Sequence, residues 1–257
     1  MKQLQAMGFT RFYACSPLIE DAKANSSVLS ALNFAEQRSV NLYAFSVKTT
    51  ANPEGLYIKS VDVVLTEKCT LKCHDCANLM QYYAKPVNCN HSIILSSVHR
   101  FMSSVDHLFE FRLLGGEPFI DKEIGDIIGE LLLFENLSYI IVYTNGTLIP
   151  SDATLAALKN PRVQVQVTDY GPLSRNIKTV LELFRQHAIN YSVTAFDKWQ
   201  DCGDIELRHR SAKELEAVYA KCCAADTYTL LHGTLYPCPF AAHAINLGAI
   251  PPWSAAQ

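Results

Sequence analysis

Between residues 59 and 196 the spacing of apolar positions switches repeatedly between two periods. Five short runs have the composition or alternation of strands, at 61–66, 109–114, 138–144, 162–171 and 190–196. Three segments between them place apolar residues three and four positions apart, as an amphipathic helix does, at 121–134, 151–160 and 174–187. Strands that alternate with helices predict an α/β fold with a mainly parallel sheet.

Two flanking regions follow different patterns. Residues 1–58 read as two helices and two strands, either a small N-terminal βα appendage or the tail of a longer parent protein. In residues 200–257, Ser211 and Glu214 form a capping box for a helix that runs to Tyr219, and Gly233 marks the turn of a hairpin. We therefore divide the chain into an appendage (1–58), a central α/β domain (59–199) and a C-terminal module (200–257).

Composition narrows the class of protein. The chain has 257 residues, 18% of them charged, and a net charge of -3, which is too little positive charge for nucleic-acid binding to be expected. The N-terminus has no unbroken apolar run of the kind found in signal peptides. Apolar runs such as 139–143 are far shorter than the roughly 20 residues that span a membrane. We expect a cytoplasmic protein, and in a reducing compartment its nine cysteines favour metal or redox use over disulfides.

Three of these cysteines, Cys69, Cys73 and Cys76, follow the first predicted strand within eight positions. The carboxyl ends of parallel strands are where α/β folds place active sites. Three thiolates can bind three irons of a [4Fe–4S] cluster and leave the fourth iron open, and an open metal position is typical of a catalytic centre. The alternative is a structural zinc site with His74, His91 or Cys89 as the fourth ligand, although zinc sites usually combine two separated cysteine pairs.

The next strands also end in distinctive motifs. The second ends in GGEP, comprising Gly115, Gly116, Glu117 and Pro118. The third ends in TNG, with Thr144 and Asn145, and the fourth in TDYG, with Thr168, Asp169 and Tyr170. Over residues 59–196 this order of motifs resembles the radical S-adenosylmethionine (SAM) superfamily. The resemblance implies a partial (β/α) barrel of about five to six parallel strands.

The resemblance also implies roles for individual residues. Cys69, Cys73 and Cys76 would bind a [4Fe–4S] cluster, and the amino and carboxylate groups of SAM would chelate its fourth iron. GGEP would bind the SAM amino group, with Glu117 as an acceptor and the two glycines allowing close approach of the ligand. Thr144, Asn145 and Thr168 would contact the SAM ribose or carboxylate. Asp169 and Tyr170 would face the substrate cavity as candidate catalytic residues, and Arg112 is a further candidate for binding an anionic group.

Two observations leave alternatives open. Gly115–Gly116 and Asn145–Gly146 are also ordinary turn sequences, and Glu117 would suit the start of a helix. The family usually has an aromatic residue just before the third cysteine, where this chain has Asp75 preceded by His74. His74 is then either a substitute aromatic surface for the adenine or a solvated loop residue.

A second group of cysteines lies in the C-terminal module: Cys202, Cys222, Cys223 and Cys238. From Cys223 to Cys238 the spacing is C-x9-G-x4-C, with Gly233 as the glycine. This spacing resembles the start of the auxiliary-cluster modules known as SPASM and twitch domains, and it implies an auxiliary iron–sulfur cluster. The alternative is that these are buried free cysteines that pack as small apolar residues.

Family resemblance therefore predicts a radical SAM oxidoreductase. The reduced cluster would cleave SAM to a 5′-deoxyadenosyl radical, which abstracts hydrogen from a small polar, carbohydrate-like substrate in an oxidation or an epimerisation. An electron donor such as flavodoxin or ferredoxin would be its partner, with neither nucleic acid nor a membrane involved. The alternatives are a peptide-modifying radical SAM enzyme and a zinc-stabilised binding module.

Overall fold

The computed structural model describes residues 55–196, 205–224 and 227–251. Nearly all of the predicted N-terminal appendage, and Cys202, lie outside the described residues.

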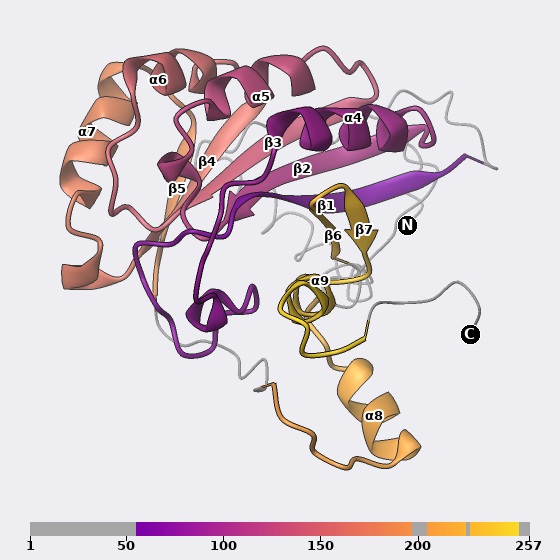
Figure 1. Cartoon of the computed structure of the whole chain (residues 1–257). Coiled ribbons are helices and arrows are strands. Elements are labelled where there is room, and N and C mark those ends of the chain that lie inside the picture. The colour runs from indigo at the N-terminus through magenta and orange to yellow at the C-terminus, as the bar shows by residue number, and fades with distance from the viewer. Residues whose placement is uncertain (1–54, 197–204, 225–226, 252–257) are drawn as a thin grey trace, which may run out of the picture.

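Within that part of the chain a seven-stranded sheet has the order β5-β4-β3-β2-β1-β6-β7 (Figure 1). Its strands are β1 (Tyr57–Thr66), β2 (His107–Gly115), β3 (Leu137–Thr144), β4 (Val163–Asp169), β5 (Tyr191–Ala195), β6 (Tyr228–Leu231) and β7 (Thr234–Tyr236). Neighbouring strands from β5 to β6 pair in parallel, and β7 is antiparallel to β6. The five predicted strands and the parallel α/β fold are confirmed, and the sheet is open, with β5 and β7 at its edges.

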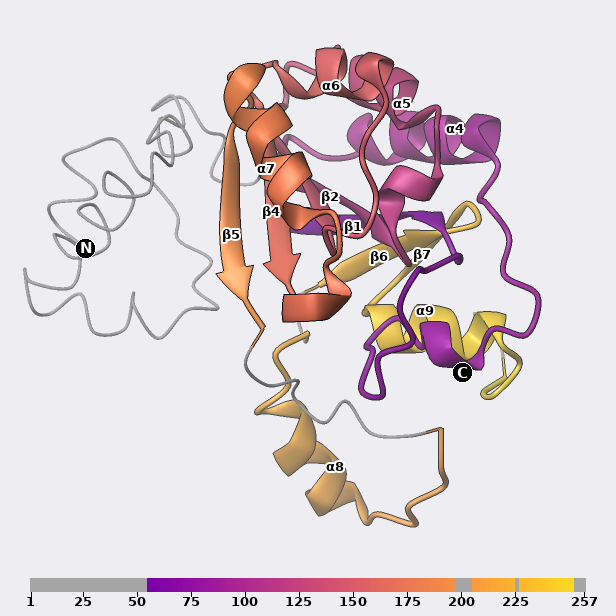
Figure 2. The same cartoon turned by 90° about the vertical axis from the view of Figure 1, so that its left-hand side faces the viewer.

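Four helices cover one face of the sheet (Figures 1 and 2): α4 (His91–Met102), α5 (Ile124–Leu131), α6 (Asp152–Leu158) and α7 (Ile177–Gln186). The last three fall inside the predicted helical segments. Helix α4 was not predicted, although Asn90 caps it by accepting a hydrogen bond from the Ile93 amide. Its buried residues recur every fourth position, at Ile94, Val98 and Met102.

The two faces of the sheet differ in polarity because successive side chains of a strand point to opposite faces. Toward the helices point fully buried apolar residues of the central strands, such as Val63, Phe111, Val142 and Val165. The opposite face, which we call the inner face, carries polar side chains from the same strands: Asp62, Glu110, Arg112, Tyr143, Gln164, Gln166, Ser192 and Thr194. Most of the hydrophobic core therefore lies on the helical side, although the inner face also contributes the fully buried Val64, with Leu114 packed against the core.

The predicted C-terminal hairpin is present, and it joins the main sheet. Strand β6 pairs in parallel with β1, with Thr229 opposite Asp62. The turn residues His232 and Gly233 have φ of 47° and 86°, as a two-residue type I′ turn requires. Helix α9 (Pro239–Asn246) follows, and its chain segment contacts both hairpin strands.

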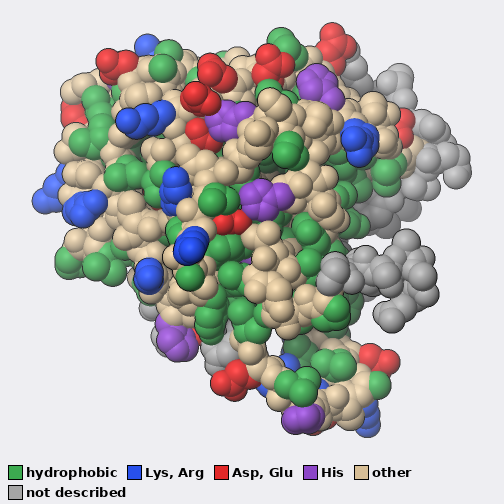
Figure 3. All heavy atoms as spheres, viewed as in Figure 1, with side chains coloured by type: hydrophobic (Ala, Val, Ile, Leu, Met, Phe, Trp, Pro, Cys, Tyr) green, Lys and Arg blue, Asp and Glu red, His purple; other side chains and the backbone are tan. Residues whose placement is uncertain are grey.

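Helix α8 (Ala212–Tyr219) begins with the predicted capping box of Ser211 and Glu214. It stands apart from the sheet in both views (Figures 1 and 2) and has no buried residue. No helix among the described residues has the length and apolar character needed to cross a membrane. Positive and negative side chains are both spread over the face shown in Figure 3.

Candidate active site

The three cysteines lie on the loop that follows β1, which we call the cysteine loop (residues 67–90). Cys69, Cys73 and Cys76 are all free thiols and half-buried. Burial raises the pKa of the Cys69 thiol to about 11, and Glu117, Cys76 and Cys73 add to the rise, so these groups lie within electrostatic reach of one another. Three soft thiol donors on one loop fit an iron–sulfur cluster, and a bound metal deprotonates its thiol ligands outright.

Among the described residues, no three His, Cys, Asp or Glu side chains are placed to hold a single metal ion. In a cubic cluster each cysteine binds a different iron, so the thiols stand farther apart than the ligands of one ion. The fit of the cysteine loop to a cluster therefore rests on its donor chemistry and on the contacts that hold the loop in place.

The double glycine of GGEP packs against the backbone of the cysteine loop. A Cβ at Gly115 would lie 2.2 Å from the Thr66 carbonyl oxygen, and a Cβ at Gly116 would lie 2.0 Å from that of Lys68. The Gly116 amide donates to the Thr66 carbonyl at 2.8 Å. The glycines are thus required because the cysteine loop approaches them, whereas the sequence suggested approach of a ligand.

Glu117 is fully buried at the N-terminus of the short 3-10 helix η3 (Pro118–Ile120). Its carboxylate accepts hydrogen bonds from the Thr144 hydroxyl at 2.8 Å, the Asn145 amide at 2.8 Å and the Phe119 amide at 3.2 Å. Burial raises the pKa of Glu117 to about 7, although these three bonds lower it. Glu117 therefore ties GGEP to the end of β3, and it also caps η3, as the simpler interpretation of the sequence anticipated.

Asn145 connects the end of β3 to the cysteine loop. Its Nδ2 donates to the Thr70 hydroxyl at 3.1 Å and to the Cys69 Sγ at 3.8 Å. Thr147 donates to the Asn145 Oδ1 at 2.6 Å, and the hydroxyls of Thr70 and Thr147 lie 2.5 Å apart. If Thr70 donates to Thr147, the three side chains form a closed ring in which each donates and accepts once. The sequence did not single out Thr70 and Thr147.

The fourth strand end meets the third through Ser174, which is 1% exposed. Its hydroxyl donates to the Asn145 carbonyl at 2.6 Å and accepts from the Tyr170 amide at 2.9 Å. The carbonyl of Thr168 lies 3.3 Å from the same hydroxyl. The cysteine loop and the ends of β2, β3 and β4 therefore form one connected unit.

The two candidate catalytic residues differ in their surroundings. Burial raises the pKa of Tyr170, and the three loop cysteines, Cys73 first, raise it further, so its hydroxyl and the thiols are within electrostatic reach of one another. Its ring also contacts Phe196, with centroids 4.9 Å apart. The Asp169 carboxylate accepts a hydrogen bond from the Gly171 amide at 2.8 Å, at the start of the 3-10 helix η4 (Gly171–Leu173). Tyr170 is therefore the candidate that lies within electrostatic reach of the cysteine loop.

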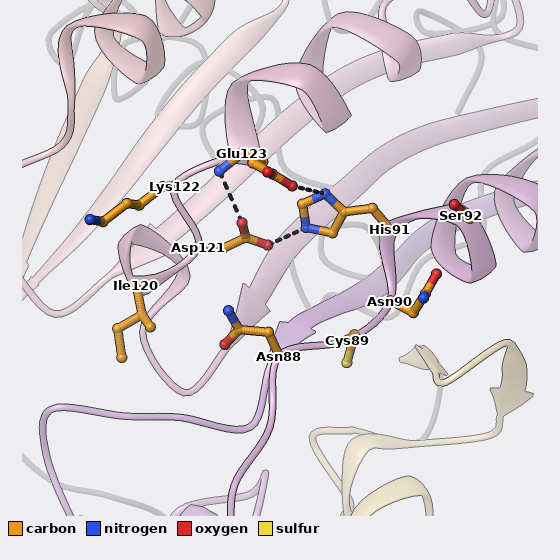
Figure 4. A pocket seen from close by; sticks show the side chains of 9 residues that line it. All are labelled: Asn88, Cys89, Asn90, His91, Ser92, Ile120, Asp121, Lys122 and Glu123. Carbon is orange, nitrogen blue, oxygen red and sulfur yellow. Dashed lines mark hydrogen bonds and ion pairs between the residues drawn. The ribbon is translucent and has the colours of Figure 1, made fainter.

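The proposed fourth ligands of a zinc site have other partners. His91 lies between Asp121, at 2.6 Å, and Glu123, at 3.3 Å, beside a surface hollow of about 580 Å³ (Figure 4). Cys89 is buried and accepts a hydrogen bond from the His232 amide. The His74 side chain is 86% exposed and pairs with Asp75, as expected for a solvated loop residue.

The C-terminal cysteines are only partly described. Cys222 and Cys223 are exposed, while Cys238 is half-buried and caps α9, its Sγ accepting from the Ala241 amide at 3.3 Å. The fourth member of the predicted group, Cys202, lies outside the described residues.

No protein-family model matches the chain. A stretch of 116 residues, 43% of this chain and 36% of the relative, is 28% identical to GTP 3′,8-cyclase of Clostridium acetobutylicum. The matched stretch thus spans about a third of that relative's length.

Solved structures show similar folds. The structure of BtrN in complex with AdoMet and 2-DOIA superposes with a TM-score of 0.50 and 14% identity, over 73% of this chain and 75% of BtrN. Native anSMEcpe with bound AdoMet and the Cp18Cys peptide has a TM-score of 0.43 and 21% identity, over 53% of this chain and 42% of that chain. The likeness to BtrN is one of fold. The cysteine loop, GGEP and TNG stand at successive strand ends of an open parallel sheet, and this arrangement, together with the sequence match to the cyclase, supports the resemblance to the radical SAM superfamily.

Proposed function

We propose that the chain is a radical SAM oxidoreductase that acts on a small polar, carbohydrate-like substrate, by oxidation or epimerisation. When bound, the [4Fe–4S] cluster and SAM supply the electron and the radical chemistry that removes hydrogen from an unactivated C–H bond. Cys69, Cys73 and Cys76 would bind the cluster. The second donor hydrogen of Asn145 points at the Cys69 sulfur, where it would support that ligand.

The polarity of the inner face is the observation that supports this substrate class. Arg112 donates to Asp62 at 2.6 Å and also bonds the Tyr143 side chain. Farther along, Ser192 donates to Gln166 at 2.5 Å, and Gln166 donates to Thr194 at 2.7 Å. Strand β1 continues into the cysteine loop, the ends of β2 and β3 contact that loop, and the end of β4 joins them through Ser174. A face of fixed donors and acceptors suits a hydroxylated substrate, because it leaves polar groups unpaired when an apolar molecule binds.

Substrate class can be tested by measuring 5′-deoxyadenosine formation and product mass. Anaerobically reconstituted protein, reduced by flavodoxin or dithionite, would be offered amino sugars, nucleotide sugars and peptides. We expect a sugar-class compound to stimulate 5′-deoxyadenosine formation and to change in mass. Stimulation by peptides alone would instead establish the peptide-modifying alternative.

A matched pair of variants tests the inner face itself. Gln166→Leu removes the side-chain bonds to Ser192 and Thr194 without leaving an unpaired buried charge. Losing one substrate hydrogen bond of about 1.4 kcal/mol should raise KM about ten-fold. The control, Gln186→Leu on the exposed surface of α7, should leave KM unchanged. Equal KM values in both variants would contradict an inner-face substrate site.

We further propose that the C-terminal module binds an auxiliary iron–sulfur cluster through Cys223, Cys238 and at least one of Cys202 and Cys222. The position of Cys238 at the N-terminus of α9 supports this, because the positive end of a helix stabilises a thiolate. A triple Ala variant at Cys69, Cys73 and Cys76 isolates this site. After reconstitution it should retain about four irons for a cubane or about two for a [2Fe–2S] cluster. Retention of no iron would remove the auxiliary cluster from the proposal.

A further inference from the structure

A buried carboxylate joins the cysteine loop to the C-terminal module. Glu67 lies two residues before Cys69 and is 4% exposed. Its Oε1 is 2.8 Å from both the His232 Nε2 and the Asn246 Nδ2, and its Oε2 accepts from the Val87 amide at 2.9 Å. A carboxylate only accepts, so His232 must donate through Nε2. Two of the three donors thus come from residues more than 160 positions away in the chain.

A second branch of the same network reaches Tyr83, on the returning half of the cysteine loop. The other hydrogen of Asn246 Nδ2 goes to the Tyr83 hydroxyl at 2.9 Å. The Tyr83 hydroxyl lies 2.7 Å from the Nδ1 of His243, which is fully buried in α9. If the hydroxyl donates to Nδ1, the imidazole proton is on Nε2, a buried atom with no hydrogen-bond partner among the described residues. Burial keeps this ring neutral by lowering its pKa to about 3.

The network binds the cysteine loop near both of its ends, at Glu67 and at Val87. The Glu67 amide donates to the Val87 carbonyl at 2.9 Å, while the Glu67 carboxylate accepts from the Val87 amide, so this residue closes the loop on itself. Asn246 then fastens the closure to the last turn of α9 and, through Tyr83, to the middle of the returning segment. Closing a loop of about twenty residues costs chain entropy, which these bonds must offset.

We propose that Glu67 and Asn246 are positioning residues: they clamp the cysteine loop to the hairpin–α9 unit (residues 228–246) and so fix where Cys69 presents its thiol. The functional consequence of the clamp rests on the proposed role of Cys69 as a cluster ligand, whereas the clamp itself does not. Cys238 is the N-cap of α9, so the same helix connects the two groups of cysteines.

The clamp can be tested first in the metal-free protein by hydrogen exchange. Asn246→Ala removes both bonds, and alanine at a helix end does not weaken α9 through its own propensity. A lost hydrogen bond to a charged group corresponds to roughly ten-fold or more in an opening equilibrium. We therefore expect exchange in residues 67–90 to accelerate about ten-fold, with Gln186→Ala as the control without effect. Acceleration confined to residues 228–250 would overturn the proposal.

Glu67 allows a test by graded substitution. Glu67→Gln keeps an acceptor for Asn246 but places an NH2 group against the Val87 amide, whereas Glu67→Ala removes all three bonds. Amide hydrogen exchange in the cysteine loop should be slowest in the parent, faster in Glu67→Gln and fastest in Glu67→Ala. A residue that only filled space would give equal rates for Gln and the parent, and that result would contradict a clamp.

The reconstituted protein supplies a second signature. In Asn246→Ala, the electron paramagnetic resonance spectrum of the reduced cluster should change and its iron should be lost faster to a chelator than in the parent. Unchanged spectra together with unchanged exchange would overturn the proposal. A parent protein that bound no iron would refute the proposed function. The clamp would still be tested, because hydrogen exchange is measured in the metal-free protein.

Discussion

Replacing Gly116 by alanine perturbs the contact on which the site geometry depends. The added Cβ would lie 2.0 Å from the Lys68 carbonyl oxygen, 2.3 Å from its carbon and 2.7 Å from the Cys69 Cβ. Real Cβ atoms essentially never approach other atoms closer than 3.0 Å, so the cysteine loop or GGEP must move by about 1 Å. The nearest atoms are backbone, and no flexible side chain can move aside in their place.

The magnitude follows from two contributions. Overpacking of a close-packed site destabilises by about 1–3 kcal/mol. The shift also lengthens or breaks the 2.9 Å hydrogen bond from the Glu117 amide to the Lys68 carbonyl. Such a bond contributes about 1 kcal/mol to the free energy of unfolding. We therefore expect Gly116→Ala to lower the free energy of unfolding by about 2–4 kcal/mol. Because the displaced segment includes Cys69, iron retention after reconstitution should fall as well.

Gly129 provides the matched control. It lies inside α5, and a Cβ there would meet no atom within 4 Å. Gly129→Ala should therefore stabilise the protein, by up to about 1 kcal/mol, through helix propensity alone. Urea unfolding of both metal-free variants, followed by circular dichroism, gives the free energies, and iron analysis gives the loading. Parent-like stability and iron content in Gly116→Ala would refute the packing argument.

Two further substitutions test individual contacts. The folded-state pKa of His243 is lowered from 6.5 to about 3, so between these pH values only the unfolded state binds the proton, and stability falls as pH decreases. Between pH 7.5 and 5.5 the parent should lose about 1.4 kcal/mol more than His243→Phe in urea unfolding; equal losses would contradict the neutral buried ring. Thr147→Val breaks the ring with Asn145 and Thr70 and should destabilise by about 1–3 kcal/mol, whereas Thr194→Val on the edge strand β5 should change the unfolding free energy by less; similar values for both would argue against the ring.

Local patterns were sufficient to predict most of the fold. Alternation in 162–171 and apolar runs such as 138–144 located strands, because burial on one or both faces leaves a direct mark on composition. Helix α4 has the same kind of mark, an Asn90 cap and apolar residues four apart, and was missed in the long connection that also holds the cysteines.

The pairing of strands that are far apart in the sequence leaves no such local pattern. The four residues of β6 show that a strand is present, but nothing in them indicates that its partner is β1 rather than β7 alone. The clamp is similar, because Glu67, His232 and Asn246 come from three segments whose meeting depends on that pairing.

The candidate site was predicted by motif and corrected in its physical detail. The sequence located Gly116 and Glu117 at a strand end, but it could not show which neighbour occupies the space beside them. In the structure that neighbour is the cysteine loop for Gly116 and the end of β3 for Glu117. Ligand-binding roles for these residues, and for Thr144, Asn145 and Thr168, stay predictions.

Reductive cleavage of SAM tests the central claim most directly. The parent and the triple Ala variant at Cys69, Cys73 and Cys76 would be reconstituted anaerobically, analysed for iron and sulfide, and assayed for 5′-deoxyadenosine under identical reducing conditions. We predict that the parent forms 5′-deoxyadenosine and that the variant forms none above the protein-free background. Formation by the triple variant at the rate of the parent would contradict the assignment of these cysteines as the ligands of a radical SAM cluster.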